Sequence, residues 1–254
     1  MLKITGTIIT YNEEKNIARC IESMLPVCDE IIVLDSLSAD KTKEICNSYD
    51  VRFKEQPFLG HVEQKNKAIE FASHDYILSL DADEALTQEL QGQILKFKEN
   101  PNSDALKFNR LTRYVDQWIR NCDWYPDVKI RVWNKNIGHW GGTNPHDLVV
   151  LKEGSKITHL KGDLLHYSYE SISDHVNQTN NFTTIAAKAA FNKGIRSNSF
   201  KVTTRPIFKF FKDYFLRRGF LEGRYGFIIC FINALSALLK YSKLKDLQEG
   251  KMID

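Results

Sequence analysis

The sequence predicts an α/β fold in which a mostly parallel sheet is flanked by helices and followed by a C-terminal helical extension. Short apolar segments alternate with helical segments over the first hundred residues, and this alternation is typical of right-handed βαβ units. Each apolar segment is followed at once by polar residues, so polar side chains are expected along one edge of the sheet. Residues 201–254 are rich in Phe, Leu, Ile, Lys and Arg, which predicts the helical extension.

The expected strands of residues 1–100 are short runs of apolar and β-branched residues bounded by polar ones. They cover residues 4–10, 30–34, 51–54 and 76–80. The expected helices cover residues 17–24, a segment after residue 40, residues 62–72 and residues 87–99. Apolar residues at helical spacing predict the first helix, which Pro26 helps to close, and Asp40 is the expected N-cap of the second.

The pattern changes after residue 100. Strands are expected at residues 105–111 and 128–133, Gly-rich turns with short β segments at 140–166, and a helix at 173–193. The segment between the two strands contains Trp118, Trp124 and Tyr125 close to Asp127. Aromatic rings beside an acid suit the binding of a sugar ring, but a Trp in a loop is more often a core residue.

Residues 76–86, YILSLDADEAL, place the carboxylates of Asp81 and Asp83 directly after an expected strand. Two acids separated by one residue can both face an ion at the carboxyl edge of the sheet. Mg²⁺ or Mn²⁺ suits carboxylate and water ligands and neutralises a diphosphate leaving group. A solvated strand end or a helix cap produces the same short pattern, so the motif by itself leaves these alternatives open.

Polar residues also follow the first two expected strands, at Thr10, Tyr11, Glu13 and Asp35. They are expected at the same edge of the sheet as Asp81, where a nucleotide would lie across the strand ends. An Asp in this position accepts a hydrogen bond from a base imide or a ribose hydroxyl. Capping of the following turn is an equally good explanation of Asp35.

Composition and charge exclude several classes of protein. The net charge is +3, but residues 201–254 contain eleven Lys/Arg against five Asp/Glu, so the tail carries the basic character. Five scattered cysteines without CxxC spacing argue against a zinc site and a disulfide framework. The basic residues form no interleaved surface in the sheet region, so no nucleic-acid partner is expected. No export signal is recognised at the N-terminus, and a cytoplasmic location is expected.

The tail has the composition of a membrane-surface helix. Its longest nearly apolar run covers residues 227–239, which is shorter than the roughly 20 residues that cross a bilayer. Basic residues flank this run at Arg217, Arg218, Arg224, Lys240, Lys243 and Lys245. An in-plane amphipathic helix on the anionic inner face of the cytoplasmic membrane explains the pattern. A helix packed on the domain or on a second subunit explains it equally well.

The motifs TYNEEKNI, QKNKAI and LSLDADE, with an Asp-ended second strand between the first two, resemble the nucleotide half of family 2 glycosyltransferases. The later segments WYPDVKIRVW, PHD, LLHYSY and GFLEGRYGF are similar to the bacterial lipopolysaccharide inner-core β-glucosyltransferases of that family. The resemblance covers nearly the whole chain. It implies a GT-A fold over residues 1–200, with a nucleotide-sugar half (1–100) and an acceptor half (101–170), and a helical tail over 201–254.

The resemblance also implies a nucleotide-diphospho sugar donor, with a UDP-sugar expected, and inversion at the anomeric carbon. Thr10, Tyr11, Glu13 and Asp35 would hold the uridine, and Lys65 would reach the base or the diphosphate. The implied acceptor is a cell-surface glycolipid or oligosaccharide, with the lipopolysaccharide core as the expected example.

A divalent cation, Mg²⁺ or Mn²⁺, is implied by the same resemblance. Asp83 would be its main ligand, Asp81 would bind the ribose or the metal, and His166 would complete the ligand set. Asp127 would be the general base, because inversion by single displacement needs one carboxylate on the acceptor side. A hydrogen-bonded core histidine and an acidic turn after Pro126 are the alternatives for His166 and Asp127.

The sequence departs from the family pattern at two places. Leu37 stands where the DSGS turn has glycine, and residues 145–147 read PHD in place of VHE. Two other functions remain as alternatives. A nucleotidyltransferase that makes a sugar nucleotide normally has a Gly-rich loop after its first strand, and TYNEEKN contains no glycine. A non-catalytic sugar-nucleotide binding module does not need the Asp pair or an acceptor-side acid.

Overall fold

The computed structural model describes residues 1–143 and 146–253 of the chain. Contacts between residues divide the chain into two compact units. Unit 1 consists of Met1–Leu111 and Asp127–Tyr167, and unit 2 consists of Thr112–Pro126 and Ser168–Asp254. The helix predicted at residues 173–193 is thus grouped with the C-terminal segment, whereas the expected division had put it with residues 1–200.

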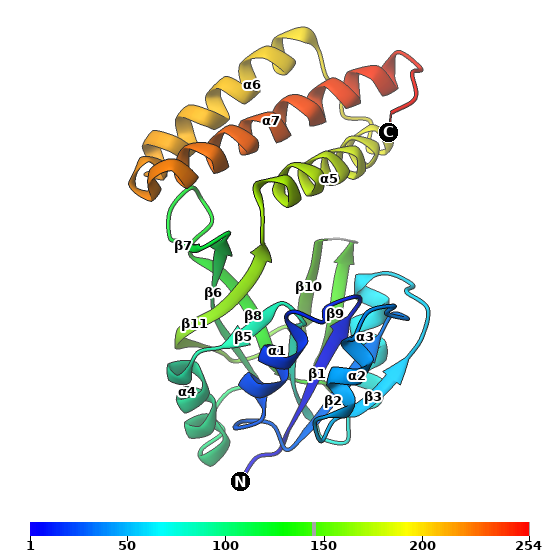
Figure 1. Cartoon of the computed structure of the whole chain (residues 1–254), viewed down its shortest axis with the longest axis vertical. Helices are drawn as coiled ribbons and strands as arrows, with labels where there is room; N and C mark the ends of the chain where they lie inside the picture. Colours follow the sequence, from blue (N-terminus) through cyan, green and yellow to red (C-terminus); the bar gives the residue numbers. More distant parts are fainter. Residues whose placement is uncertain (144–145, 254) are drawn as a thin grey trace. The chain divides into compact units, whose positions relative to one another are not determined.

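Four parallel strands form one half of the sheet in unit 1 (Figure 1). They are β1 (Ile4–Thr10), β2 (Glu30–Asp35), β3 (Arg52–Glu55) and β4 (Tyr76–Asp81), in the order β3-β2-β1-β4. The register places Thr10 beside Asp35 and Ile9 beside Asp81. Because parallel strands end on the same side, the polar residues that follow β1, β2 and β4 lie at one edge of the sheet. The four predicted strands are confirmed.

The predicted helices of this half are also present. They are α1 (Ile17–Met24), α2 (Thr42–Asn47), α3 (His61–Glu70) and α4 (Gln88–Glu99). The Thr87 hydroxyl caps α4 by accepting the N–H of Leu90. The N-cap of α2 is Lys41 and not Asp40, which lies one residue before it. The Asp40 carboxylate nevertheless accepts the N–H of Thr42, the first residue of the helix, at 3.0 Å.

Apolar side chains cover both faces of the sheet, which is why its strands are nearly continuous in apolar residues. On one face the residues of β1 and β4 pack with Ile17, Ile21, Leu90 and Ile94 of α1 and α4. A smaller cluster on the other face contains Ile32, Ile77, Trp133 and Trp140, with Val62 and Ile69 of α3 packed against it. The sheet is therefore packed between two apolar layers.

Further strands, several of them antiparallel to a neighbour, extend the sheet beyond β4. They are β8 (Asp127–Asn134), β6 (Ala105–Tyr114), β11 (Ile157–Tyr169) and β5 (Glu84–Leu86), in this order, while β7 (Gln117–Ile119) pairs with β6, and β9 (Gly138–Thr143) pairs with β10 (His146–Leu151). The predicted fold class is confirmed, with parallel pairing throughout β1–β4 and antiparallel pairing of β8 with β4 and β6 and of β5 with β11. The antiparallel pairing of β5 with β11 places His166 opposite Glu84, although the two are far apart in sequence.

Unit 2 contains three helices, α5 (Ile172–Asn192), α6 (Ser199–Phe211) and α7 (Gly223–Gln248). A π-helical turn, Lys212–Leu216, and a 3₁₀ turn, Gly219–Glu222, connect α6 to α7. The connection crosses the start of α7 so closely that a Cβ atom on Gly226 would lie 1.9 Å from the carbonyl oxygen of Gly219. Only glycine fits at position 226.

The core of unit 2 includes part of the aromatic segment between β6 and β8. Tyr114 is fully buried, and Trp124, Tyr169 and His175 surround it with ring centroids 5.3–5.7 Å from its own. Burial lowers the pKa of His175 to about 4, so it is a neutral core residue at pH 7. Trp124 is thus a packing residue, in agreement with the core alternative for the loop aromatics.

One helical segment of the described chain, Gly219–Gln248, is long and apolar enough to cross a membrane by length and composition. The sequence-based estimate had considered only its most apolar thirteen residues. Residues along one side of α7 are buried, among them Tyr225, Ile229, Ile232 and Leu244. The helix therefore has partners within unit 2, namely α5 and α6.

Candidate active site

The two loops that follow β1 and β2 form one hydrogen-bonded edge. The N–H of Asn12 donates to Ser38 Oγ at 2.8 Å, and the N–H of Glu13 donates to Thr42 Oγ1 at 2.8 Å. In return, Asn12 Oδ1 accepts the N–H of Ala39 at 2.8 Å. These bonds join loops from two different strands, so this edge is ordered by the protein itself.

The predicted nucleotide residues on this edge differ in how their side chains are used. Thr10 is buried, and its hydroxyl has no hydrogen-bond partner among the described residues. Tyr11 is 61% exposed and presents its ring to solvent. Asp35 is fully buried, and its carboxylate accepts the N–H of Ser38 at 2.7 Å and also the Ser38 hydroxyl. Tyr11 is therefore accessible to a ligand, the Thr10 hydroxyl is unpaired but buried, and the Asp35 carboxylate stabilises its own turn.

The turn after Asp35 contains the first departure from the family pattern, Leu37. Leu37 has a φ of 65°, in the left-handed region that glycine adopts without strain. Its side chain is 53% exposed, so no packing at this position accounts for the leucine. The backbone conformation expected of the family glycine is thus kept although the residue has changed.

Three consecutive residues of α3, the QKN of QKNKAI, each hold a different part of the site. Gln64 donates to Ser36 Oγ at 3.1 Å, and Asn66 exchanges two hydrogen bonds with the backbone of Trp140. Lys65 lies between them with only 3% of its side chain exposed. Its Nζ is 2.8 Å from Asp81 Oδ1 and 2.7 Å from Asp147 Oδ2.

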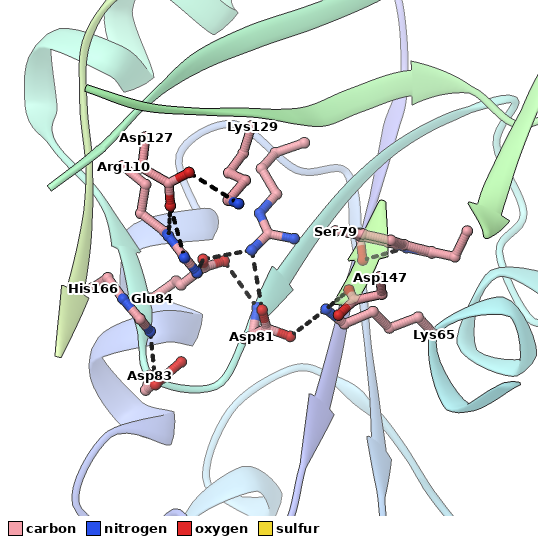
Figure 2. Close-up of polar contacts among 12 residues, drawn as sticks. Lys65, Ser79, Asp81, Asp83, Glu84, Arg110, Asp127, Lys129, Asp147 and His166 are labelled. Atoms are coloured by element: carbon pink, nitrogen blue, oxygen red, sulfur yellow. Dashed lines mark hydrogen bonds and ion pairs between the residues drawn. The ribbon is translucent and has the colours of Figure 1, made fainter. Parts of the chain in front are cut away.

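Asp81 belongs to a chain of ion pairs in unit 1 (Figure 2). Its second oxygen, Oδ2, is 3.0 Å from Arg131 Nη2, and the same Nη2 is 2.5 Å from Glu84 Oε1. Arg110 lies 3.3 Å from the same Glu84 oxygen and also pairs with Asp127. The members of this charge chain alternate in sign and are, in order, Asp147, Lys65, Asp81, Arg131, Glu84, Arg110, Asp127 and Lys129.

Asp127, the first residue of β8, has a cation at each of its carboxylate oxygens. Arg110 approaches Oδ2 with Nε at 2.9 Å and Nη2 at 2.8 Å, and Lys129 Nζ lies 2.9 Å from Oδ1. The Lys129 side chain is 37% exposed, whereas that of Arg110 is 20% exposed. Oδ1 is thus the oxygen more accessible to an incoming hydroxyl group, which would displace only the exposed lysine.

Asp83 and His166 form a separate pair on the other side of Glu84. Asp83 Oδ2 is 3.2 Å from His166 Nε2, and β5–β11 pairing brings these residues together. Carboxylate oxygen and imidazole nitrogen are ligands that Mn²⁺ accepts. Both oxygens of Asp81 are taken by Lys65 and Arg131. The described residues contain no group of three or more His, Cys, Asp and Glu that would hold a metal by themselves.

Comparison with known proteins identifies the family. The family profile described as "Glycosyl transferase family 2" matches residues 7–150. An uncharacterized glycosyltransferase of Rickettsia typhi is 36% identical over 257 residues, which cover 97% of this chain and 88% of that protein. The chain belongs to glycosyl transferase family 2. The family predicted from the motifs is confirmed, and so is the general activity of a glycosyltransferase.

Two further comparisons involve proteins with more specific descriptions. The lipopolysaccharide core biosynthesis glycosyltransferase LpsC of Rhizobium meliloti is 27% identical over 256 residues, covering 96% of this chain and 92% of LpsC. The crystal structure of S. aureus TarS 1-349 in complex with UDP-GlcNAc aligns with 100% of this chain and 93% of that chain, at 16% identity and a TM-score of 0.48.

Neighbouring basic side chains keep the acids of this glycosyltransferase ionised. Burial raises the pKa of Asp81, but Lys65 and Arg131 outweigh this effect and hold the pKa well below its usual range. Burial likewise acts against Asp83 and Asp127, yet His166 lowers the pKa of Asp83, and Arg110 with Lys129 lowers that of Asp127. The three carboxylates are therefore charged at neutral pH.

Sequence reasoning assigned no role to Glu84, Arg110 or Arg131. Glu84 and Arg131 lie inside the motifs LSLDADE and WYPDVKIRVW, so the motifs contained a signal for both. Glu84 is 1% exposed, and a buried glutamate requires a cationic partner. Arg110 carried no such signal, because an arginine in a strand usually faces solvent. Of the PHD segment, Asp147 lies in the charge chain, and Pro145 lies outside the described residues.

Proposed function

We propose that this glycosyltransferase is an inverting enzyme that uses a nucleotide-diphospho sugar, with a UDP-sugar as the expected donor, and a divalent cation, Mg²⁺ or Mn²⁺. The observation that carries the proposal is the separation of two kinds of acid at one sheet edge. Asp83 is paired with an imidazole, and Asp127 is ionised and partly exposed on another strand. The first arrangement suits a metal ligand, and the second suits a base.

The donor side of the proposal uses the loops after β1 and β2. The exposed ring of Tyr11 would stack on the base, and the unpartnered Thr10 hydroxyl would bond to the nucleoside. Glu13 and Asp35 would contribute to nucleoside binding at the same edge. Asp35 would do so by fixing the conformation of the turn at Ser38. Lys65 would keep Asp81 oriented toward the ribose. Asp83 and His166 would hold the cation, which supplies charge neutralisation of the departing diphosphate.

On the acceptor side, Asp127 would accept the proton of the acceptor hydroxyl group as its oxygen bonds to the anomeric carbon. The bond between that carbon and the diphosphate oxygen breaks in the same step, and the electron pair leaves with the nucleotide. One carboxylate is sufficient for this single displacement, which inverts the anomeric centre. Arg110 would hold Asp127 in place from the buried side.

We assign the acceptor to the class of cell-surface glycolipids or oligosaccharides, with the lipopolysaccharide core as the expected example. The likeness to LpsC over nearly the whole chain supports this assignment. A glycolipid acceptor requires the enzyme to work at the membrane surface, so we assign it to the cytoplasm and peripherally to the inner face of the cytoplasmic membrane. Family membership argues against the nucleotidyltransferase alternative.

The proposal is tested by a hydrolysis screen of UDP-, GDP- and dTDP-sugars with and without Mn²⁺, because donor hydrolysis needs no acceptor. Release of nucleoside diphosphate from a UDP-sugar only with Mn²⁺ is the expected result. Metal-independent release, or release from another donor class alone, would overturn the corresponding part of the proposal.

Asp83→Ala is expected to abolish the effect of Mn²⁺ on UDP affinity and to lower donor hydrolysis by about 10²-fold or more, because a Lewis acid supplies several kcal/mol. Calorimetric titration of UDP with and without Mn²⁺ measures the first effect. Asp75→Ala is the matched control, since Asp75 is exposed and directly precedes β4, whereas Asp83 follows the other end of that strand. Unchanged metal dependence in Asp83→Ala would remove Asp83 from the metal site.

Lys129→Met is expected to move the acid limb of the hydrolysis rate to higher pH. Lys129 and Arg110 lower the pKa of Asp127, so loss of Lys129 raises that pKa and protonates the base at a higher pH. The pH dependence of kcat/KM measures the shift. Lys152→Met removes the same charge at an exposed position outside the charge chain and is the control. An unshifted limb would mean that another group limits the rate at low pH.

A further inference from the structure

The two helices α6 and α7 with the turns between them, here called the α6–α7 hairpin, expose an unusual number of large apolar side chains. On the first arm the exposed residues are Phe200, Ile207, Phe208, Phe211 and Phe215, with exposed fractions of 53–74%. Their spacing of seven, one, three and four residues puts them on one helical face. On the second arm the exposed aromatic residues are Phe220, Phe227 and Phe231. Monomeric proteins rarely expose so many grouped aromatics.

Ring contacts join the two arms into one aromatic surface. Phe211 stacks on Phe215 with ring centroids 5.7 Å apart, and Phe227 stacks on Phe231 at 6.4 Å. Phe210 contacts both Phe211 on its own helix and Phe227 on α7, at 6.1 and 5.7 Å. The apolar surface is thus continuous across the hairpin and is not a set of isolated side chains.

The charges around this aromatic surface have one sign. Residues 199–244 contain nine Lys/Arg and only two acids, Asp213 and Glu222. Asp213 is fully buried, where Lys209 and Asn233 bind it at 3.0 and 2.9 Å. Glu222 is 7% exposed and accepts hydrogen bonds from Gln117 and from the N–H of Arg120. The exposed charges of residues 199–244 are therefore all positive. The charge of Arg217 is partly neutralised by its ion pair with Asp123.

We propose that the α6–α7 hairpin docks on an anionic lipid surface, with its phenylalanines in the interfacial region and its lysines and arginines on the lipid phosphates. Aromatic rings beside clustered basic residues match that surface in both polarity and charge. A second copy of the chain is a poorer occupant, because a two-fold contact through this face would bring like charges together. The helices lie in the membrane plane, since α7 packs on α5 and Lys243 donates to the Asn180 carbonyl group at 2.8 Å.

The biological role of the docking surface, which is to bring the enzyme to a lipid-linked acceptor, rests on the proposed function. Docking itself is measured without donor or acceptor. Donor hydrolysis that fails while vesicle binding persists would overturn the sugar transfer and leave the docking surface standing. Vesicle binding that fails while hydrolysis persists would overturn the docking surface and leave the sugar transfer standing.

The experiment is co-sedimentation of the full chain with vesicles of phosphatidylcholine alone and of phosphatidylcholine with phosphatidylglycerol. Binding is expected only with the anionic vesicles, and it should weaken as salt rises, because screening shortens the reach of the charges. Phe208→Ser with Phe211→Ser, and separately Arg205→Glu with Arg218→Glu, should each weaken binding by about tenfold or more. These side chains are exposed, so the fold and the hydrolysis rate should be unchanged.

The matched controls are Phe58→Ser and Lys152→Glu, which change an exposed Phe and an exposed Lys in unit 1 and should leave binding unchanged. Equal binding to neutral and anionic vesicles, or full binding by either hairpin variant, would overturn the proposal. A dimer in light scattering that the Phe208→Ser, Phe211→Ser variant abolishes would assign the surface to a second copy. Retention in vesicles after an alkaline carbonate wash would contradict in-plane docking and favour a membrane span.

Discussion

Asp127→Asn is expected to lower kcat by about 10² to 10⁴-fold while leaving the affinities for UDP and Mn²⁺ nearly unchanged. The carboxylate is needed only as the new bond forms, when it accepts the proton of the acceptor hydroxyl group. Asp127 pairs with Arg110 and Lys129, whereas Asp83 pairs with His166. Nucleoside diphosphate release under saturating donor measures kcat, and calorimetry measures binding.

Asp123→Asn is the control for this prediction, because Asp123 is an acid four residues earlier in the sequence whose carboxylate pairs with Arg217 within unit 2. It should retain full activity. Weakened UDP or Mn²⁺ binding in Asp127→Asn, or near-normal turnover, would remove Asp127 as the base. Asp147 would then be the next candidate, since it lies at the other end of the charge chain.

Glu84→Ala is expected to lower the free energy of unfolding by about 3–5 kcal/mol, which is the usual effect of removing one partner from a buried ion pair. Glu84 has no exposed side-chain surface and is the common partner of Arg131 and Arg110. Its carboxylate also accepts the N–H of Asp81 at 3.1 Å. Without it, Arg131 keeps its ion pair with Asp81 and Arg110 keeps its pair with Asp127, so each largely buried guanidinium group loses one of its two carboxylate partners. Urea unfolding followed by circular dichroism measures the change.

Glu55→Ala provides the comparison, because Glu55 pairs with Lys43 at 2.8 Å while both side chains are well exposed. Such a surface pair contributes about 0–1 kcal/mol. If Glu84→Ala costs no more than Glu55→Ala, the arginines must be stabilised by solvent in place of Glu84. Donor hydrolysis by folded Glu84→Ala should also fall, since Arg110 would no longer be held between Glu84 and Asp127.

The local elements of this protein were predictable because their signals are local. Apolar runs ended by polar residues predicted β1–β4 to within one residue at each end, and helical spacing of Ile17, Cys20, Ile21 and Met24 predicted α1. The same local motifs predicted the family, which the comparison confirms. The sequence also indicated that the polar strand ends would meet, because parallel strands share a direction.

Tertiary structure alone decided which charges meet and which are exposed. Antiparallel pairing of β5 with β11 brings His166 to Asp83, and no local pattern specifies that register. The partners of Glu84 come from β6 and β8, and burial makes their charges interdependent. Asp213 and Glu222 counted as acids in the sequence, but burial removes them from the hairpin surface and leaves it positive. The periodicity of apolar residues predicts whether a segment forms a helix or a strand. The role of a charged side chain depends on neighbours that only the folded chain supplies.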